Sequence, residues 1–387
     1  MRFRSLGAVA AAMVLAACAT ATPKPNLATD ARPSAVPASG PAARPSDAPP
    51  IADVRSLRGW HDDNHIAAFT AFRNTCGASR DAATVEVCRR ARSLILLTDA
   101  QAQAFFETNF RAEPVGPEGV LTAYFAPEYQ ARSMPDAEFS APVRAKPSDL
   151  VVVDAGTFDP AQAGSPGAAR NIAGLLVPYP DRAEIEAEPA EQVLAWMRPE
   201  ELFFLQIQGS GVLTFENGAR VKANYAGNNG RRFAGVANPM RDRGLLPASD
   251  TSGEAIRNWL AAHRGLDADA VMQLNPRYVF FSLAPDDGRE PVGAAGVPLP
   301  PGRAIAVDPA RHAMGDLFWI DAAAPTLNGA FPAYRRLALA LDTGGAIKGD
   351  ARADLYLGLG PDAGVEAGRV RHVLKMYRLV PRVGPQS

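Results

Sequence analysis

The sequence predicts a mainly β protein, with strands arranged as a β-barrel or sandwich and with accessory helices. Two observations support this prediction. From about residue 115 to the C-terminus, short runs of β-type residues alternate with Gly, Pro and Asn, which is typical of barrels and sandwiches and not of a doubly wound parallel sheet. Residues 53–107, in contrast, contain little Gly or Pro and repeat apolar side chains at helix-like intervals.

The chain begins with an export signal. Arg2 and Arg4 precede an apolar stretch over residues 6–15, and Leu-Ala-Ala leads directly into Cys18. A basic start, a short apolar core and small residues are typical of a secretory signal. The cysteine resembles that of a bacterial lipobox, which implies a lipid anchor on Cys18, and Ala19 in place of Asp implies anchoring in the outer membrane, facing the periplasm. An ordinary signal peptide that happens to contain a cysteine is the alternative.

Residues 19–52 are predicted to form a flexible tether. They are rich in Ala, Pro, Ser and Thr and lack the apolar surface for a core. The whole chain has a formal net charge of -1, which gives no bulk attraction to nucleic acid. No apolar run after the signal is long enough to span a bilayer.

The predicted helical region carries the other two cysteines. In an exported protein, Cys76 and Cys88 are predicted to form a disulfide, and two buried thiols are the alternative. His61 and His65 lie one helical turn apart, but the sequence offers no third ligand beside them, so no metal site is predicted.

The rest of the folded part is predicted to contain short strands and two helices. The helices are expected over residues 182–197 and 254–263. The strands are expected over residues 119–125, 150–153, 203–208, 221–225, 278–282, 304–307, 318–320, 337–341, 355–357 and 372–379.

Two of these predicted strands carry side chains suited to a polar ligand. Strand alternation over residues 203–208 would place Gln206 and Gln208 on one face, where their amides could bind hydroxyl and amide groups. A solvated sheet face is the alternative. Tyr124 and Glu128 stand at the end of another strand, where an aromatic ring suits sugar stacking and core packing equally well.

The stretch over residues 335–358 is central to the functional prediction. An apolar run ends at Asp342, two glycine turns follow, and Asp354 opens a second apolar run. This pattern predicts strand, tight loop and strand, with two carboxylates at the mouth of paired strands. The alternative is that Asp342 caps its own turn and Asp354 is a turn residue. An aspartic protease site is disfavoured, because the sequence lacks the second Asp-Thr-Gly or Asp-Ser-Gly that such a site needs.

Several motifs follow one another in a recognisable order. They are Thr122-x-Tyr124-x-x-Pro127-Glu128, Phe203-Phe204-x-Gln206-x-Gln208-Gly209-Ser210-Gly211, Tyr225-Ala226-Gly227-x-Asn229-Gly230, Asn275-Pro276-x-Tyr278, Gly296-Val297-Pro298 with Asp308, and Asp342-Thr343-Gly344-Gly345-Ala346-Ile347-Lys348-Gly349 with Asp354. Together they resemble the membrane-bound lytic murein transglycosylase A (MltA) family with its C-terminal 3D domain, whose three aspartates fall on Asp308, Asp342 and Asp354.

The resemblance implies a double-psi β-barrel built from segments on either side of a smaller inserted β-domain, with a glycan groove between them. Its approximate regions are the signal 1–18, the tether 19–52, a helical region with the first barrel segment 53–150, the inserted domain 151–270, and the 3D domain 271–387 that completes the barrel.

The resemblance also implies an activity. Such an enzyme cuts the β-1,4 bond between N-acetylmuramic acid and N-acetylglucosamine in peptidoglycan without water, and releases 1,6-anhydro-muramyl products. Asp354 would act as general acid and then base, with Asp342 beside it, and neither a metal nor a cofactor is implied. The side chains implied to position the glycan are Tyr124, Glu128, Gln206, Gln208, Ser210, Asp308 and Lys348.

Two alternatives remain open. One is a lipoprotein that binds peptidoglycan without cutting it. The other is a glycoside hydrolase of the same polymer, which would need a second carboxylate such as Glu128 or Asp308. The expected partners are peptidoglycan strands, the membrane through the lipid anchor, and complexes for cell-wall synthesis or division.

Overall fold

The structure is a computed structural model that describes residues 52–94, 98–164, 166–324 and 331–382. The predicted signal, the lipid-anchor residue Cys18 and almost all of the predicted tether lie outside these residues. The described residues belong to the unit Pro49–Ser387. No helix within them is both long and apolar enough to cross a membrane.

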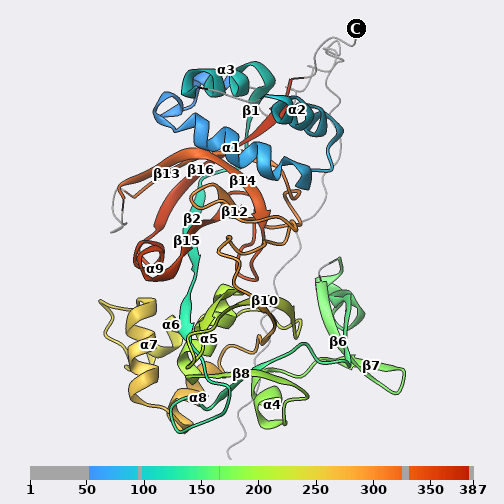
Figure 1. The fold of residues 1–387 in the computed structure, drawn as a ribbon, viewed down its shortest axis with the longest axis vertical. Helices are drawn as coiled ribbons and strands as arrows, with labels where there is room; N and C mark the ends of the chain where they lie inside the picture. Colours follow the sequence, from blue (N-terminus) through green and yellow to red (C-terminus); the bar gives the residue numbers. More distant parts are fainter. Residues whose placement is uncertain (1–51, 95–97, 165, 325–330, 383–387) are drawn as a thin grey trace, which may run out of the picture. The chain divides into compact units, whose positions relative to one another are not determined.

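The largest sheet contains seven strands (Figure 1). They are β1 (Phe110–Pro114), β2 (Gly119–Ala126), β12 (Ala304–Ala306), β13 (Leu317–Ala323), β14 (Ala333–Asp342), β15 (Arg352–Leu359) and β16 (Arg371–Pro381). Their order is β1-β16-β13-β14-β12-β15-β2, and β16 also pairs with β2. The strands of this sheet other than β1 therefore form a closed ring of pairings.

One hydrophobic core collects alternate residues from every strand of this ring. These residues include Leu121, Ile305, Phe318, Ile320, Ala338, Ala340, Ala353, Leu355, Leu374 and Met376. Successive side chains of a strand point to opposite faces. Since Ala353 and Leu355 point into this core, Arg352 and Asp354 of β15 point away from it, and so does Thr122, the neighbour of Leu121 on β2.

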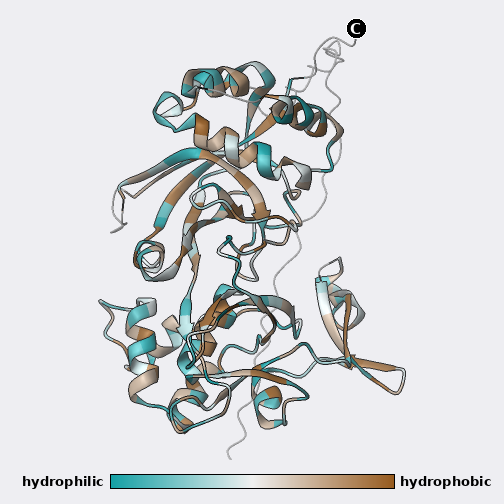
Figure 2. Cartoon of the chain, viewed as in Figure 1, coloured by the Kyte–Doolittle hydropathy of each residue, from teal (hydrophilic) through white to brown (hydrophobic). Residues whose placement is uncertain are grey.

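Three helices cover another part of the sheet. They are α1 (His65–Thr75), α2 (Ala82–Ser93) and α3 (Asp99–Asn109), and they confirm the predicted helical region. A second core joins their side chains Phe69, Phe72 and Phe106 to the sheet residues Trp319 and Leu337. Hydrophobic residues lie where helices and strands meet, and hydrophilic ones on the outer turns (Figure 2). Cys76 and Cys88 form a disulfide with their Cα atoms 5.6 Å apart.

A buried ion pair ties the start of this helical region to the sheet. The two carboxylate oxygens of Asp63 each accept a hydrogen bond of 2.7 Å from the guanidinium of Arg303. Asp63 also accepts the backbone N–H of Leu337, on β14, at 2.9 Å. Both charged side chains are buried. Each charge is therefore neutralised by its partner in place of the water that it has lost.

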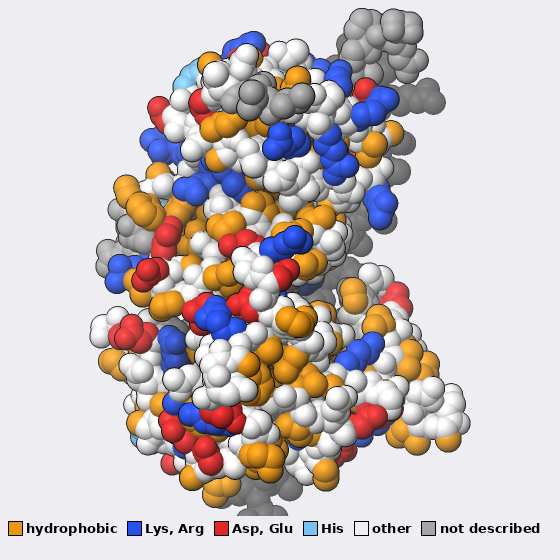
Figure 3. All heavy atoms as spheres, in the orientation of Figure 1, with side chains coloured by type: hydrophobic (Ala, Val, Ile, Leu, Met, Phe, Trp, Pro, Cys, Tyr) orange, Lys and Arg blue, Asp and Glu red, His pale blue; other side chains and the backbone are white. Residues whose placement is uncertain are grey.

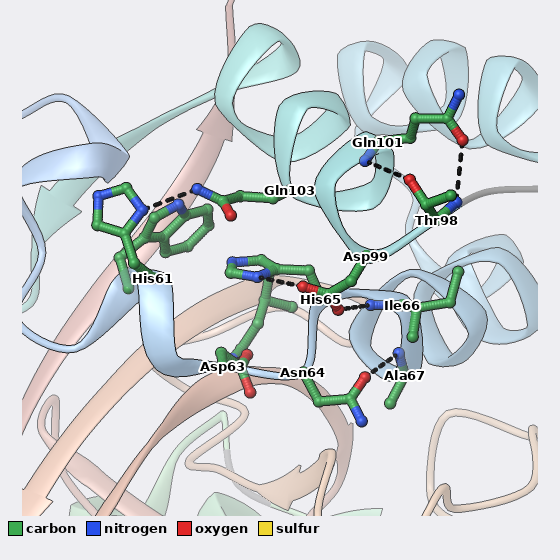
Figure 4. Close-up of polar contacts among 12 residues, drawn as sticks. His61, Asp63, Asn64, His65, Ile66, Ala67, Thr98, Asp99, Gln101 and Gln103 are labelled. Carbon is green, nitrogen blue, oxygen red and sulfur yellow. Dashed lines mark hydrogen bonds and ion pairs between the residues drawn. The ribbon is translucent and has the colours of Figure 1, made fainter.

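The helix starts in this region are fixed by side-chain caps (Figure 4). Asn64 Oδ1 accepts the N–H of Ala67 at 2.9 Å, which caps α1, and Thr98 and Gln101 form a capping box at α3. Asp99 Oδ1 accepts the N–H of Ile66 at 2.9 Å and so links the starts of the two helices.

His61 and His65 have separate neighbours, as Figure 4 shows. His61 Nδ1 lies 2.8 Å from Gln103 Nε2, and His65 Nδ1 lies 3.8 Å from Asp99 Oδ2. The part of the chain that the structure describes contains no group of three or more His, Cys, Asp or Glu side chains that could hold a metal ion.

The chain between β2 and β12 forms three further sheets. Their orders are β11-β10-β9-β3, β4-β8 and β5-β6-β7. The strands are β3 (Glu128–Gln130), β4 (Ala141–Arg144), β5 (Leu150–Asp154), β6 (Pro166–Ile172), β7 (Leu175–Pro178), β8 (Val193–Met197), β9 (Gly211–Thr214), β10 (Arg220–Asn228) and β11 (Val279–Pro285). The helices are α4 (Arg182–Ala187), α5 (Pro199–Gln208), α6 (Ala237–Asp242), α7 (Gly253–Ala262) and α8 (Leu266–Met272), and α9 (Gly360–Ala367) follows β15.

The mainly β prediction is confirmed, but the predicted strand over residues 203–208 is wrong. These residues belong to helix α5. Pro199 occupies the first turn, and Gly209 ends the helix in the left-handed conformation at φ 87°, the usual asymmetry of helix ends. Gln206 and Gln208 therefore do not share a strand face.

The helix predicted over residues 182–197 is wrong in its second half. Helix α4 ends at Ala187, and residues 193–197 form strand β8, which pairs antiparallel with β4. Pro189 explains the early end, because the residue before a proline is disfavoured in the α conformation.

The two strands that carry Asp342 and Asp354 are not direct neighbours. β12 lies between them, parallel to β14 and antiparallel to β15. The predicted simple pair of strands is therefore wrong. The two carboxylates still belong to the same level of the sheet, because Ala306 of β12 is the register partner of both Asp342 and Asp354.

Candidate active site

Asp354 is held beside Thr122 by the register of two parallel strands. The two residues are Cα partners in the pairing of β15 with β2. Thr122 Oγ1 donates a hydrogen bond to Asp354 Oδ1. Among the described residues, Asp354 Oδ2 receives no hydrogen bond, and the side chain is partly exposed. One carboxylate oxygen is thus engaged, and the other is free to exchange a proton.

Asp342, at the end of β14, is much more fully bonded. Its Oδ2 accepts the hydroxyl of Tyr124 at 2.7 Å. Its Oδ1 accepts the backbone N–H groups of Ala294 at 3.0 Å and Thr343 at 2.9 Å. The bond from Thr343 is the turn-capping contact that the sequence offered as an alternative role, so Asp342 caps its turn and also faces the site.

The surroundings raise the pKa of both aspartates. Burial raises the pKa of Asp354 and the charge of Asp342 adds to this, whereas the hydrogen bond from Thr122 and the charge of Arg352 act in the opposite direction. Burial also raises the pKa of Asp342, and its three hydrogen bonds oppose the change. Asp354 therefore holds a proton at a higher pH than an exposed aspartate does.

Tyr124 links Asp342 to an aromatic pair of the sheet. Its ring centroid lies 5.2 Å from that of Tyr356, its register partner on β15. The hydroxyl of Tyr356 donates to Glu290 Oε2 at 2.6 Å. Burial, followed by the charge and hydrogen bond of Asp342, raises the pKa of Tyr124 well above its ordinary value. Tyr124 therefore stays neutral and remains a donor to Asp342.

Asp308 and Lys348 act together on the loop between the two aspartates. Lys348 Nζ lies 3.4 Å from Asp308 Oδ1. Asp308 Oδ2 accepts the N–H of Gly349 at 2.9 Å, and its Oδ1 accepts the N–H of Ala310 at 3.2 Å. Gly349 has φ 106°, a conformation that a side chain would strain. The buried Asp308 therefore fixes this turn.

The two glutamines predicted to bind the ligand lie in different surroundings. Gln206 is buried and donates from Nε2 to the carbonyl of Val279 at 3.3 Å, so its side chain does not reach a ligand surface. Gln208 Oε1 accepts the N–H of Phe125, on β2, at 3.3 Å. Ser210 is partly exposed just after the end of α5.

Glu128 forms its hydrogen bond in another sheet. Its Oε1 accepts a hydrogen bond from Arg220 Nη2 at 2.7 Å, across the strands of another sheet. None of the hydrogen bonds found among the described residues joins Glu128 to Asp354 or Asp342.

Sequence reasoning missed two members of the site. Thr122 belongs to one of the sequence motifs without a role of its own, and the sequence motifs do not include Arg352. Arg352 Nη2 donates to Thr122 Oγ1 at 2.9 Å. The two-residue spacing of Arg352 and Asp354, just before the strand predicted over residues 355–357, was the available signal, since in an extended chain it puts both side chains on one face.

Comparison with known proteins supplies the family. Residues 120–282 match the model of the MltA specific insert domain, and residues 303–380 match that of the 3D domain. The membrane-bound lytic murein transglycosylase A of Escherichia coli K12 is 30% identical over 263 residues, which is 67% of this chain and 65% of that protein. The chain thus matches a little under two thirds of the length of this relative.

Two solved structures are similar over most of their length. The membrane-bound lytic murein transglycosylase from Agrobacterium tumefaciens has a TM-score of 0.75 and 34% identity, covering 86% of this chain and 98% of that one. MltA from Neisseria gonorrhoeae has a TM-score of 0.71 and 26% identity, covering 86% and 92%. With its motifs, its strand order and these matches, the chain belongs to the family of membrane-bound lytic murein transglycosylases A.

Proposed function

We propose that this protein cuts peptidoglycan strands without water, at the β-1,4 bond between N-acetylmuramic acid and N-acetylglucosamine, with Asp354 as the single acid and base. Membership of the lytic murein transglycosylase family supports the choice of polymer and reaction. The observation that carries the assignment is the difference in bonding between the two aspartates.

Asp342 is poorly suited to proton transfer, because three donors already occupy its two oxygens. Asp354 has one engaged oxygen and one free oxygen within the described residues, and burial raises its pKa. A general acid needs both a proton near working pH and an open path to the substrate. Burial raises the pKa of Asp354 in the direction of the first requirement, and its free oxygen meets the second, while Asp342 supports it by its negative charge.

The first step is protonation of the leaving oxygen. Protonated Asp354 donates from Oδ2 to the glycosidic oxygen, and the bond from C1 of the muramyl residue to that oxygen breaks. Positive charge develops on the muramyl ring. The carboxylate left on Asp354 and the nearby carboxylate of Asp342 both stabilise that charge.

The second step closes the product ring. The Asp354 carboxylate takes the proton of the muramyl C6 hydroxyl, whose oxygen bonds to C1 and forms the 1,6-anhydro sugar. Asp354 ends the cycle protonated, as it began, and no water is consumed. Because the nucleophile belongs to the substrate, the second catalytic carboxylate of an ordinary glycosidase is not required.

Glycan positioning falls to the partly exposed polar side chains near the site. Lys348 is 62% exposed and is held in place by Asp308. Gln208 and Ser210 are partly exposed at the end of α5. Gln206, which is buried and bonded to Val279, is left out of this proposal.

The same proposal covers the architecture and location. The ring of pairings from β2 to β16 supports a double-psi barrel, and the chain between β2 and β12, which includes residues 151–270, supports the inserted domain. The relatives are named membrane-bound, which supports a lipid anchor at Cys18 in the outer membrane. Wall-synthesis or division complexes are the partners in keeping with that location.

The test is mass spectrometry of the soluble products from purified murein sacculi treated with the protein lacking residues 1–18. Muropeptides ending in a 1,6-anhydro sugar, one water lighter than hydrolysis products, are expected. Reducing-end products would make the protein a hydrolase and direct the search for a base to Glu128 or Asp308. Retention on sacculi without any release would make it a binding protein.

Asp354→Asn is expected to lower the rate of anhydro-product release by about 10²–10⁴-fold, the usual contribution of a general acid and base. Asp342→Asn is the matched variant and is expected to cost less, because its role is electrostatic. Circular dichroism and melting temperature serve as folding controls for both. Near-full activity of Asp354→Asn in a folded protein would move the assignment to Asp342.

A further inference from the structure

Arg352 lies next to the proposed acid without binding it. It precedes Asp354 by two residues on β15, so both side chains project from the same face. Its hydrogen bonds go to Thr122 Oγ1 at 2.9 Å, to the carbonyl of Ala353 at 2.6 Å and to the carbonyl of Val120 at 3.4 Å. None of them goes to Asp354, although the charge of Arg352 acts on that carboxylate.

The chemistry of these groups fixes the direction of each hydrogen bond. A guanidinium has donors only, so Thr122 Oγ1 must be the acceptor toward Arg352. A threonine hydroxyl has a single proton. With the guanidinium on one side of Thr122 Oγ1, that proton is directed to the acceptor on the other side, which is Asp354 Oδ1.

We propose that Arg352 is a positioning residue that acts on Asp354 through the hydroxyl of Thr122, so that Oδ1 of Asp354 is kept as an acceptor and Oδ2 carries the proton of the reaction. This inference rests on the proposed role of Asp354. It adds the choice of oxygen and the two residues that determine it.

The geometry has a consequence for proton affinity. A hydrogen bond donated to the carboxylate and a nearby positive charge both favour the charged form. The hydrogen bond from Thr122 and the charge of Arg352 lower the pKa of Asp354, against burial and the charge of Asp342, which raise it. Removing either Arg352 or the Thr122 hydroxyl should therefore raise this pKa further.

Other ionisable groups lie on the strands near Asp354. Tyr124 on β2 stays neutral, and Asp342 on β14 opposes ionisation of Asp354. Tyr356 follows on β15 and bonds to Glu290. Arg371 on β16 is the Cα partner of Thr122 on its other side, and its charge acts on Arg352. Arg371 therefore offers a charge-matched control, because no hydrogen bond found among the described residues joins it to Thr122.

The experiment compares Arg352→Met, Thr122→Val and Thr122→Ser with Arg371→Met. Two readouts are used: the pH profile of kcat/KM for anhydro-product release, and the titration of the Asp354 carboxyl by carbon-13 NMR, assigned with Asp354→Asn. Arg352→Met and Thr122→Val should each lower kcat by about 10–100-fold, the usual cost of misplacing a reacting group. Both should move the alkaline limb of the profile to higher pH, because the protonated acid then persists to higher pH.

Thr122→Ser keeps a hydroxyl and should therefore show the wild-type rate and the wild-type position of the alkaline limb. Arg371→Met should also keep the wild-type rate. The double variant Arg352→Met/Thr122→Val should be no slower than the worse single variant, since both act through one hydrogen bond. Rates that fall equally at every pH, with an unchanged pKa of Asp354, would overturn the proposal that Arg352 acts on Asp354 through Thr122. Arg352 would then be a strand-packing residue. If the wild type releases no anhydro product but the pKa of Asp354 still rises in the variants, the role of Arg352 and Thr122 is supported and the proposed function is contradicted.

Discussion

Asp308 is a buried carboxylate whose surroundings favour its charged form. Burial acts to raise its pKa, but the N–H groups of Gly349 and Ala310 and the ammonium of Lys348 outweigh burial, so the pKa lies below its ordinary value. A pKa that is lower in the folded than in the unfolded protein stabilises the fold above the unfolded value. That stabilisation is lost as the pH falls through the folded value.

We therefore expect Asp308→Asn to lower the free energy of unfolding at pH 7 by about 1–3 kcal/mol, the cost of leaving a buried partner unpaired. The difference from wild type should shrink as the pH falls below about 4, where the carboxylate is protonated in the wild type as well. Urea unfolding at pH 7 and at successive acidic values measures both effects.

Asp362→Asn is the control for this prediction. Asp362 is exposed in the first turn of α9, and its substitution should change stability by less than about 0.5 kcal/mol at any pH. A constant difference between wild type and Asp308→Asn across the whole pH range would show that the charge of Asp308 contributes nothing.

Strand register, at the level of secondary-structure elements, assembles the site. β2 and β15 bring Thr122 opposite Asp354 and Tyr124 opposite Tyr356. A shift of one residue would turn all four side chains into the core. The apolar residues Leu121, Ala353 and Leu355, which fill that core, therefore also determine where the polar residues lie.

The sequence was sufficient to predict most strands and both carboxylates, because alternation and glycine turns are local patterns. It could not reveal that β12 separates β14 from β15, since strand order depends on tertiary pairing. It also misassigned α5, where Leu205 and Ile207 mimic strand alternation while Pro199 and Gly209 mark the helix ends. The sequence could not reveal the Arg352–Thr122 contact either, because this contact depends on the pairing of β15 with β2.

One buried ion pair adds to the hydrophobic core that connects the N-terminal helices to the sheet. Asp63→Ala would leave Arg303 buried without its carboxylate and would leave the N–H of Leu337 without its acceptor. We expect the free energy of unfolding to fall by about 3–5 kcal/mol, as for other broken buried pairs. Denaturant unfolding at neutral pH measures this loss.

Asp62→Ala is the matched control, because Asp62 is adjacent and exposed. It should change stability by less than about 0.5 kcal/mol. Equal losses in the two variants would mean that the ion pair has no net role. Rates of anhydro-product release measured below both melting temperatures should stay equal to wild type, since Asp63 has no contact with Asp354.

For the molecule as a whole, the signal and tether predict that the folded part is held at a membrane by one lipid. Cys18→Ser should abolish incorporation of labelled palmitate and move the protein from the membrane fraction to the soluble periplasmic fraction. Cys76→Ser, the control, should keep the label, because the disulfide of Cys76 with Cys88 is separate from the anchor. Membrane retention of unlabelled Cys18→Ser would contradict the lipid anchor.

The strand that carries Thr122 and Tyr124 comes early in the chain, and its partners come late. Thr122 and Asp354 are 232 residues apart in sequence, and Tyr124 and Asp342 are 218 apart. Such contacts require closure of a very long loop, which makes them slow to form. A chain that is still folding therefore lacks the proton donor of the proposed reaction until β15 has joined β2. The order of the elements thus delays the proposed activity until folding is nearly complete.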